Sequence, residues 1–297
     1  MRSAYSELIF VDVGLRGQRY PVKATDLRLI AISSGVIYHR AMENVAAFLP
    51  DGLPLWAALV AILASFFTSA LTAAFGLGGG LALLAVMSSV FPPLAVIPIH
   101  GVAQAGSNAG RFYLQRRDVV WPIVLWFSAG GILGAMLGGR LALEMPVWLL
   151  RGGVACFILY TVWGPKPGSF APGPKTFFAT GAIAAFLTMF FGATGPIAAT
   201  MIGAAKLDRL KIVATHATAM VIQHLMKILT FGLLGFAFGD WIMVILAILV
   251  AGFIGTYAGT HFLRRMPDHL FRRGFKTILT IIALYLIAVA LMDFRTG

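Results

Sequence analysis

The sequence predicts an all-α polytopic membrane protein made of two inverted repeats, each with about five helical segments. Hydrophobic residues make up 59% of the 297 residues and charged residues only 11%, whereas soluble domains carry about 25% charged residues. The mean hydropathy is +0.88. Long apolar runs recur along the chain, and its second half repeats landmarks of the first half. The runs are uniformly apolar and lack the alternation of barrel strands, so a β-barrel is disfavoured.

Eight apolar runs are candidate membrane helices, and most reach the roughly 20 residues that cross ~30 Å of hydrocarbon. They cover residues 55–75, 94–114, 119–143, 147–163, 177–191, 210–238, 241–263 and 270–291. Two shorter apolar pieces, residues 77–90 and 197–205, directly follow glycine-rich motifs and are expected to be half-helices. Because an unpaired backbone group costs several kcal/mol in lipid, the breaks before them are expected to face an internal cavity.

The duplication is visible as motifs that recur at a constant separation. Three landmarks recur after 116 residues, namely Phe75-Gly-Leu-Gly-Gly-Gly80, His100 and Arg111, which return as Phe191-Gly-Ala-Thr-Gly-Pro196, His216 and Lys227. Three more recur after 121 residues, namely Gly134, Gly138 and Met145-Pro146, which return as Gly255, Gly259 and Met266-Pro267. A short insertion therefore separates two matching frames. Such internal repeats are typical of transporters whose binding site lies between the repeats.

The domain boundaries follow from these runs. Residues 1–54 are expected to form a peripheral extension, residues 55–163 the first repeat and residues 176–297 the second. Residues 164–175 are a Pro/Gly-rich linker, because proline cannot continue a helix. No signal peptide is expected, since the first apolar stretch, residues 27–38, is short and is interrupted by polar residues and glycine.

Basic residues predict the orientation of the chain. From Leu55 onward there are 17 basic and 6 acidic residues, and the basic excess lies in four short stretches at residues 116–117, 166–175, 206–211 and 264–276. Short basic loops stay in the cytoplasm, and all four lie on one side if each repeat has five segments. An odd number of segments inverts the second copy. Since the basic residues flank membrane spans, binding of nucleic acid is not expected.

Polar residues inside the apolar runs are the candidates for a binding site. One helix face of the first repeat carries a stripe about 60° wide, made of His100, Gln104, Ser107 and Arg111, with Asn108 beside it. The same positions of the second repeat hold His216, Met220, Gln223 and Lys227, and His224 matches Asn108.

The two basic residues of these stripes have alternative interpretations. A positive charge at the centre of a membrane helix costs about 2.5–3.5 kcal/mol, so Lys227 is expected to point inward. The alternative is that Arg111 and Lys227 extend to the membrane surface, as long basic side chains do readily. The histidines are candidates for the site, and the alternative for them is hydrogen bonding between helices.

Glycines are expected to have two roles. A half-helix that begins near Gly78 or Thr194 points unpaired N–H groups and the positive end of its dipole into the cavity, which suits an anion. Packing of helices is the expected role of Gly130, Gly131, Gly134, Gly138, Gly252, Gly255 and Gly259, because small residues let helices approach closely.

Metal and cofactor chemistry is not expected. The sequence has no histidine pair one helical turn apart with an accompanying acid and no cysteine pair, and the single cysteine, Cys156, lies in an apolar run. The acids after Leu55 all lie at or near predicted loops, at Asp118, Glu144, Asp208, Asp240, Asp268 and Asp293. This placement argues against a carboxylate cage for sodium. If transport is linked to protons, His100 and His216 are the candidates, because imidazole titrates nearest to neutrality.

Four segments recur in both repeats and form a pattern. They are the motif of residues 75–80, the basic turn before Val119-Val120-Trp121, the Gly134-x-x-x-Gly138 helix and the segment from Met145-Pro146 to Arg151, with their second copies. This pattern resembles the TauE/SafE family of sulfite and organosulfonate exporters. The likeness covers about residues 55–291 and implies transport of small sulfur-containing anions, commonly outward. The chain departs from the family pattern in residues 1–54 and at Pro196, so the two anion contacts are not expected to be strictly equivalent.

Together these observations predict a multi-pass secondary transporter of the inner membrane that exports a small sulfur-containing anion, needs no cofactor or metal and is not an enzyme. Its partners are the anion and the lipid bilayer, and self-association stays open. Two alternatives are an intramembrane enzyme, which lacks a nucleophile or metal pattern here, and a structural or assembly protein without transport. The expected site residues are Gly78, Gly79, Gly80, His100, Gln104, Ser107, Asn108, Arg111, Gly192, Thr194, Gly195, Pro196, His216, Gln223, His224 and Lys227.

Overall fold

The computed structural model describes residues 8–12, 19–23, 48–75, 78–164, 171–261 and 268–296. The chain divides into two compact units, Met1–Leu49 and Pro50–Gly297. In the first unit, β1 (Leu8–Asp12) and β2 (Arg19–Lys23) form an antiparallel hairpin in which Leu8 lies opposite Lys23. The sequence predicts an extension in this region but not these strands.

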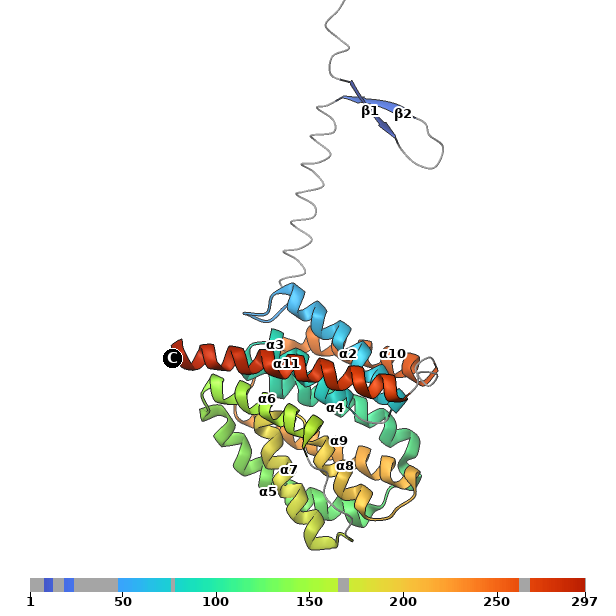
Figure 1. The fold of residues 1–297 in the computed structure, drawn as a ribbon, viewed down its shortest axis with the longest axis vertical. Helices are drawn as coiled ribbons and strands as arrows, with labels where there is room; N and C mark the ends of the chain where they lie inside the picture. The colour runs from blue at the N-terminus through green and yellow to red at the C-terminus, as the bar shows by residue number, and fades with distance from the viewer. Residues whose placement is uncertain are drawn as a thin grey trace, which may run out of the picture. The chain divides into compact units, whose positions relative to one another are not determined.

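The described residues of the second unit form helices (Figure 1). The α-helices are α2 (Leu55–Phe75), α3 (Gly79–Val90), α4 (Pro93–Gln115), α5 (Trp121–Glu144), α6 (Val147–Trp163), α7 (Pro174–Phe191), α8 (Gly195–Ala204), α9 (Arg209–Leu233), α10 (Ile242–His261) and α11 (Asp268–Thr296). Two short 3-10 helices are η1 (Arg116–Asp118) and η2 (Phe238–Trp241). The predicted all-α architecture is confirmed.

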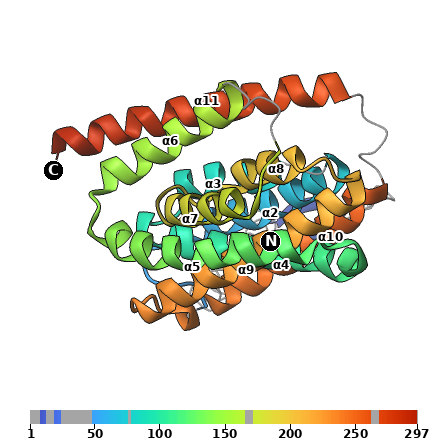
Figure 2. The ribbon, with the colours of Figure 1, turned by 90° about the horizontal axis from the view of Figure 1, so that it is seen from below.

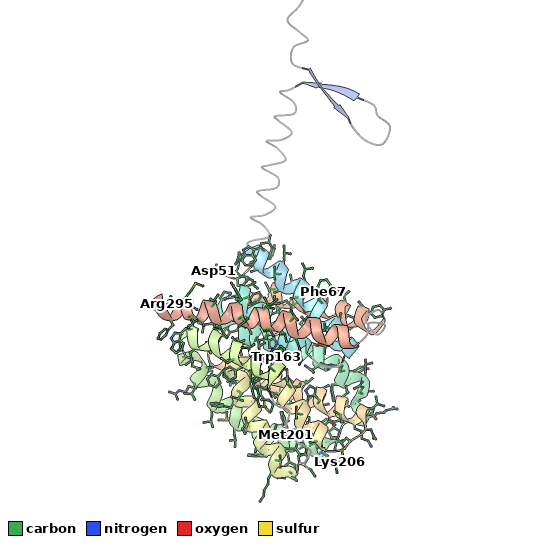
Figure 3. The ribbon with its side chains drawn as sticks, viewed as in Figure 1. Asp51, Phe67, Trp163, Met201, Lys206 and Arg295 are labelled. Carbon is green, nitrogen blue, oxygen red and sulfur yellow. The ribbon has the colours of Figure 1, made fainter. Side chains whose placement is uncertain are left out.

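Five helices are long and apolar enough to cross a membrane, and they are α2, α5, α7, α9 and α10. Their outer faces are apolar. On α2, for example, Leu59, Leu63 and Phe67 are 51%, 59% and 64% exposed and follow one another at one turn of helix. Figure 3 labels Phe67 on this helix. Exposed apolar stripes of this kind are unfavourable in water and suit lipid. The chain is therefore an integral membrane protein.

The two predicted breaks are present. The helix α2 ends at Phe75 and α3 begins at Gly79, while α7 ends at Phe191 and α8 begins at Gly195. The caps Gly78 and Gly192 have φ angles of 102° and 74°, a backbone conformation that favours glycine. With 12 and 10 residues, α3 and α8 are too short to span a bilayer. Both half-helices of the predicted fold are thus confirmed.

Glycines join the long helices in two pairs, α5 with α7 and α2 with α10. A methyl group at Gly134 would lie 2.0 Å from the carbonyl oxygen of Ala182, and a methyl group at Gly255 would lie 2.0 Å from that of Phe66. Only a residue without a side chain allows such close backbone contact. The packing role expected for Gly134 and Gly255 is confirmed, and the same holds for Gly130, Gly138 and Gly259.

The pairing of helices is symmetrical with respect to the duplication. The duplication relates α5 to α10 and α7 to α2, so the packed pair α5–α7 corresponds to the packed pair α10–α2. The helix α4 packs on its own counterpart α9, and α6 packs on its counterpart α11. Figure 2 shows α6 and α11 crossing on one side of the other helices.

The counterparts run antiparallel. Along α4, Gly101 lies next to Lys227, whereas Val120, just beyond its C-terminal end, donates to Thr215 near the start of α9. On α6 and α11, Arg151 pairs with Asp293 and Trp163 with Thr280. An inverted repeat requires antiparallel counterparts. The inversion relative to the membrane stays a prediction that this arrangement supports.

Candidate functional site

A cavity of about 60 Å³ lies where the two half-helices meet the central pair of helices. Its walls come from α2, α3 and α4 of the first repeat and from the α7–α8 break and α9 of the second. The predicted site residues that line it are Gly78, Gly80, His100, Gln104, Asn108, Arg111, Gly195, Pro196, His216 and His224. The structure therefore brings together residues of both repeats.

Four lining residues are absent from the predicted site, namely Thr72, Leu81, Ala193 and Met220. For Thr72 the sequence contains a usable signal. It is the last of four small polar residues that are spaced along one face of α2 within its apolar run. All four are buried, namely Ser65, Thr68, Ser69 and Thr72. A hydroxyl row on one helix face, directly before a break, marks the face that turns inward.

The two duplicated histidines hold the half-helices. The Nε2 atom of His100 lies 2.8 Å from the carbonyl oxygen of Gly80, and the Nε2 atom of His216 lies 3.1 Å from that of Gly195. A carbonyl oxygen only accepts hydrogen bonds, so each Nε2 must carry its hydrogen and donate. Each histidine thereby connects the central helix of its repeat to the first turn of the half-helix.

Arg111 places a positive charge at the cavity. Its Nη2 atom donates to Oδ1 of Asn108 over 2.8 Å, and Nδ2 of Asn108 donates to the carbonyl oxygen of Gln104 over 2.8 Å. Asn108 is buried and is therefore a fixed support for the guanidinium. Among the described residues that line the cavity, Arg111 is the only lysine or arginine and there is no carboxylate. The cavity is therefore electropositive.

His224 differs from the other two histidines. Its Nδ1 atom is buried and has no hydrogen-bond partner within the described part of the chain, and its ring centre lies 6.1 Å from that of His100. In one neutral tautomer Nδ1 carries the hydrogen and can donate to a bound solute. The Nδ1 atom of His100 is also without a partner there, but it is an acceptor in the neutral ring because Nε2 carries the hydrogen.

The other predicted site residues lie behind the cavity wall or beside it. Lys227 points inward, as predicted, and is 0% exposed, but it does not line the cavity. Its Nζ atom donates to the carbonyl oxygen of Gly192 over 2.7 Å. Gln223 donates to the hydroxyl of Thr194 over 2.8 Å. Gly79 packs on α2, where a methyl group would lie 1.9 Å from the carbonyl oxygen of Thr68, and the half-buried Ser107 does not line the cavity either.

Among the residues that the structure describes, no three His, Cys, Asp or Glu side chains are grouped as a metal ion would require. The acids of the described helices lie near helix ends, as the sequence predicts, for example Asp118 in η1 and Asp240 in η2.

Comparison with known proteins identifies the family. The model of the family described as Sulfite exporter TauE/SafE matches residues 61–286, which is more than half of the chain and spans both repeats. No curated protein and no solved structure was found to match the chain. With ten described α-helices, two of which are half-helices, and this match, the chain belongs to the TauE/SafE sulfite exporter family, a family of membrane transporters.

Proposed function

We propose that this protein is a secondary transporter that carries a small sulfur-containing anion, such as sulfite or an organosulfonate, out of the cell across the inner membrane. The observation that carries this proposal is the cavity itself. There the N-terminal ends of α3 and α8 meet Arg111, and no carboxylate is among the described lining residues. An anion is the solute that this set of groups favours.

The helix ends supply hydrogen-bond donors. The first N–H groups of a helix have no intrahelical partner, and the helix dipole adds about half a positive charge there. In α3 these groups belong to Gly79, Gly80 and Leu81, of which Gly80 and Leu81 line the cavity. Such N–H groups, together with the Arg111 guanidinium and Nδ1 of His224, would replace the water shell that an anion loses on entry.

The half-helix α8 supplies fewer donors than α3. Pro196 has no N–H group, and the N–H of Ile197 already donates to the carbonyl oxygen of Thr194 over 3.0 Å. The two anion contacts are therefore unequal, as the difference between Pro196 and Gly80 suggests.

The size of the cavity favours a compact solute. One water needs about 10–15 Å³ of such space, so about 60 Å³ holds a solute equivalent to a few water molecules. An inorganic oxyanion such as sulfite has this size, whereas an organosulfonate with a longer carbon chain requires a wider form of the cavity. The inside-negative membrane potential favours outward movement of an anion by about 2.3 kcal/mol per charge per 100 mV.

Efflux from liposomes tests the proposal. Purified protein is reconstituted into liposomes loaded with radiolabelled sulfite, and release is measured for the wild type, Arg111→Met and Arg117→Met. Arg111 lines the cavity, whereas Arg117 is exposed in η1. Arg111→Met is expected to slow release about 10- to 100-fold, because a hydrogen bond to a charged group contributes about 1.5–3 kcal/mol, while Arg117→Met keeps the wild-type rate. If the wild type releases sulfite no faster than loaded liposomes without protein do, the result contradicts the proposal.

A further inference from the structure

Lys227 is the one fully buried charged residue among the described side chains, and the anion contacts proposed above do not include it. We propose that Lys227 is a positioning residue that holds the break between α7 and α8 and thereby fixes the N-terminal end of α8 against the cavity, without touching the anion. The part of this proposal that concerns the anion rests on the proposed function. The part that concerns the break does not.

The first step is the contact with the end of α7. Gly192 caps this helix, and its carbonyl oxygen accepts hydrogen bonds from Nζ of Lys227 at 2.7 Å and from Oγ1 of Thr188 at 3.1 Å. The last carbonyl groups of a helix lack intrahelical partners and form the negative end of its dipole. A lysine placed there satisfies such a carbonyl and stabilises the helix end.

The second step is the contact with the start of α8. One turn before Lys227, Nε2 of Gln223 donates to Oγ1 of Thr194 over 2.8 Å, and that hydroxyl donates to the carbonyl oxygen of Ala184 in α7 over 2.9 Å. Two side chains of α9 therefore hold both ends of the break, Gly192 and Thr194. The residue between them, Ala193, lines the cavity, so these contacts set the position of the cavity wall.

The third step is the surroundings of the lysine itself. Its aliphatic part lies against α4, where a methyl group at Gly101 would be 3.0 Å from Cδ of Lys227. The side chain is thus enclosed between two helices and ends on a backbone carbonyl instead of in the cavity. Its counterpart in the first repeat, Arg111, lines the cavity. The duplicated cations therefore have different tasks, one at the anion and one at the backbone.

Hydrogen exchange at the break tests the positioning role without any ligand. Amide exchange of residues 193–198 is measured for wild type, Lys227→Met, Lys227→Arg and the control Lys211→Met, a lysine at the exposed start of α9. Lys227→Met is expected to raise exchange about tenfold or more, because it removes a hydrogen bond to a charged donor. Lys227→Arg keeps donors and is expected to restore much of the protection. Lys211→Met is expected to behave as wild type.

Binding of two anions then separates positioning from direct contact. The affinities for thiosulfate, a divalent anion, and methanesulfonate, a monovalent anion, are compared. Lys227→Met is expected to weaken binding of both anions by a similar factor, because Arg111 still faces the anion. The ratio of thiosulfate affinity to methanesulfonate affinity therefore stays at the wild-type value. Arg111→Met is expected to lower the ratio and to leave exchange at residues 193–198 unchanged.

The outcomes are distinguishable. If Lys227→Met lowers the affinity ratio and leaves exchange at the break unchanged, Lys227 is an anion ligand and the inference is overturned. If the wild type binds neither anion and releases no sulfite from liposomes while Lys227→Met raises exchange, the proposed substrate is wrong and the positioning role stands. Lys227→Gln is the second variant should Lys227→Met not fold. Its shorter side chain does not reach Gly192, so the same rise in exchange is expected.

Discussion

Neighbouring glycines of the first motif have different physical roles. A methyl group at Gly79 would overlap the backbone of α2, at 1.9 Å from the carbonyl oxygen of Thr68. Gly80 instead lines the cavity, and the group nearest to it is the flexible end of Gln104. One of the two residues therefore brings the half-helix close to α2, and the other leaves room for a solute.

Alanine substitutions separate these two roles. Gly79→Ala is expected to lower the temperature of thermal unfolding in detergent, because overpacking costs about 1–3 kcal/mol or more. Gly195→Ala is expected to keep stability, since its methyl group would lie 3.8 Å from Nε2 of His216 and from Sδ of Met220. It enters the cavity, however, and is expected to weaken sulfite binding. The control is Gly203→Ala, whose methyl group meets nothing within 4 Å. Wild-type sulfite affinity in Gly195→Ala would argue against this cavity as the site.

A single isosteric change at Asn108 tests the charge of the cavity. Asn108→Asp keeps the acceptor for Arg111, 2.8 Å away, but adds a negative charge that offsets the guanidinium. At an effective dielectric constant of 20, two unit charges about 4 Å apart interact by ~4 kcal/mol, so sulfite efflux is expected to fall more than 100-fold. Asn108→Leu removes the acceptor without adding charge, and a smaller loss is expected. Equal losses in the two variants would show that the charge of the cavity does not matter.

At the scale of elements, two helix pairs depend on the same type of glycine contact. Gly134 brings α5 onto α7, and Gly255 brings α10 onto α2, each with a methyl position 2.0 Å from a carbonyl oxygen. Gly134→Ala and Gly255→Ala are both expected to lower the unfolding temperature, by similar amounts because the contacts are equivalent. Gly110→Ala, which meets nothing within 4 Å, is expected to be neutral. Unchanged unfolding in Gly134→Ala would contradict the packing shown here.

The helical elements are predictable from sequence because length and apolarity decide them in lipid. The expected runs 55–75 and 147–163 coincide with α2 and α6. The run 210–238 extends too far, because α9 ends at Leu233 before Gly235, whose φ angle is 92°. An apolar run continues through a turn of this kind, so hydropathy alone does not locate it. The β1–β2 hairpin has no such signal.

The site is predictable in part, and the reason is geometrical. Helical spacing shows that His216, Gln223 and Lys227 share a face, but it does not show what covers each part of that face. The α7–α8 break covers Gln223 and Lys227 and leaves His216 at the cavity. How far a half-helix extends along its neighbour depends on tertiary packing. Neither the composition of the chain nor the helical spacing of its polar residues predicts it.

At the scale of the whole molecule, the orientation in the membrane is testable with single cysteines. The helix α9 has 25 residues and is about 37 Å long, so its two ends are expected to lie on opposite sides of ~30 Å of hydrocarbon. In a Cys156→Ala background, Lys206→Cys, in the basic loop before α9 (Figure 3), is expected to react only with reagent in the cytoplasm. Asp240→Cys, in η2, is expected to react only from outside. The reverse pattern would invert the predicted topology.

The proline at the start of α8 makes the two sides of the cavity chemically unequal. Since Pro196 lacks the N–H donor that Gly80 retains, a solute is expected to be held less tightly on the α8 side than on the α3 side, and its affinity differs between the two membrane faces if each side opens to a different face. Microscopic reversibility requires any resulting difference in half-saturating concentration between the two faces to be matched by an equal difference in maximal velocity. Under the proposed function, net transport follows the solute gradient in either direction, and the maximal velocity is expected to be higher in one of the two directions.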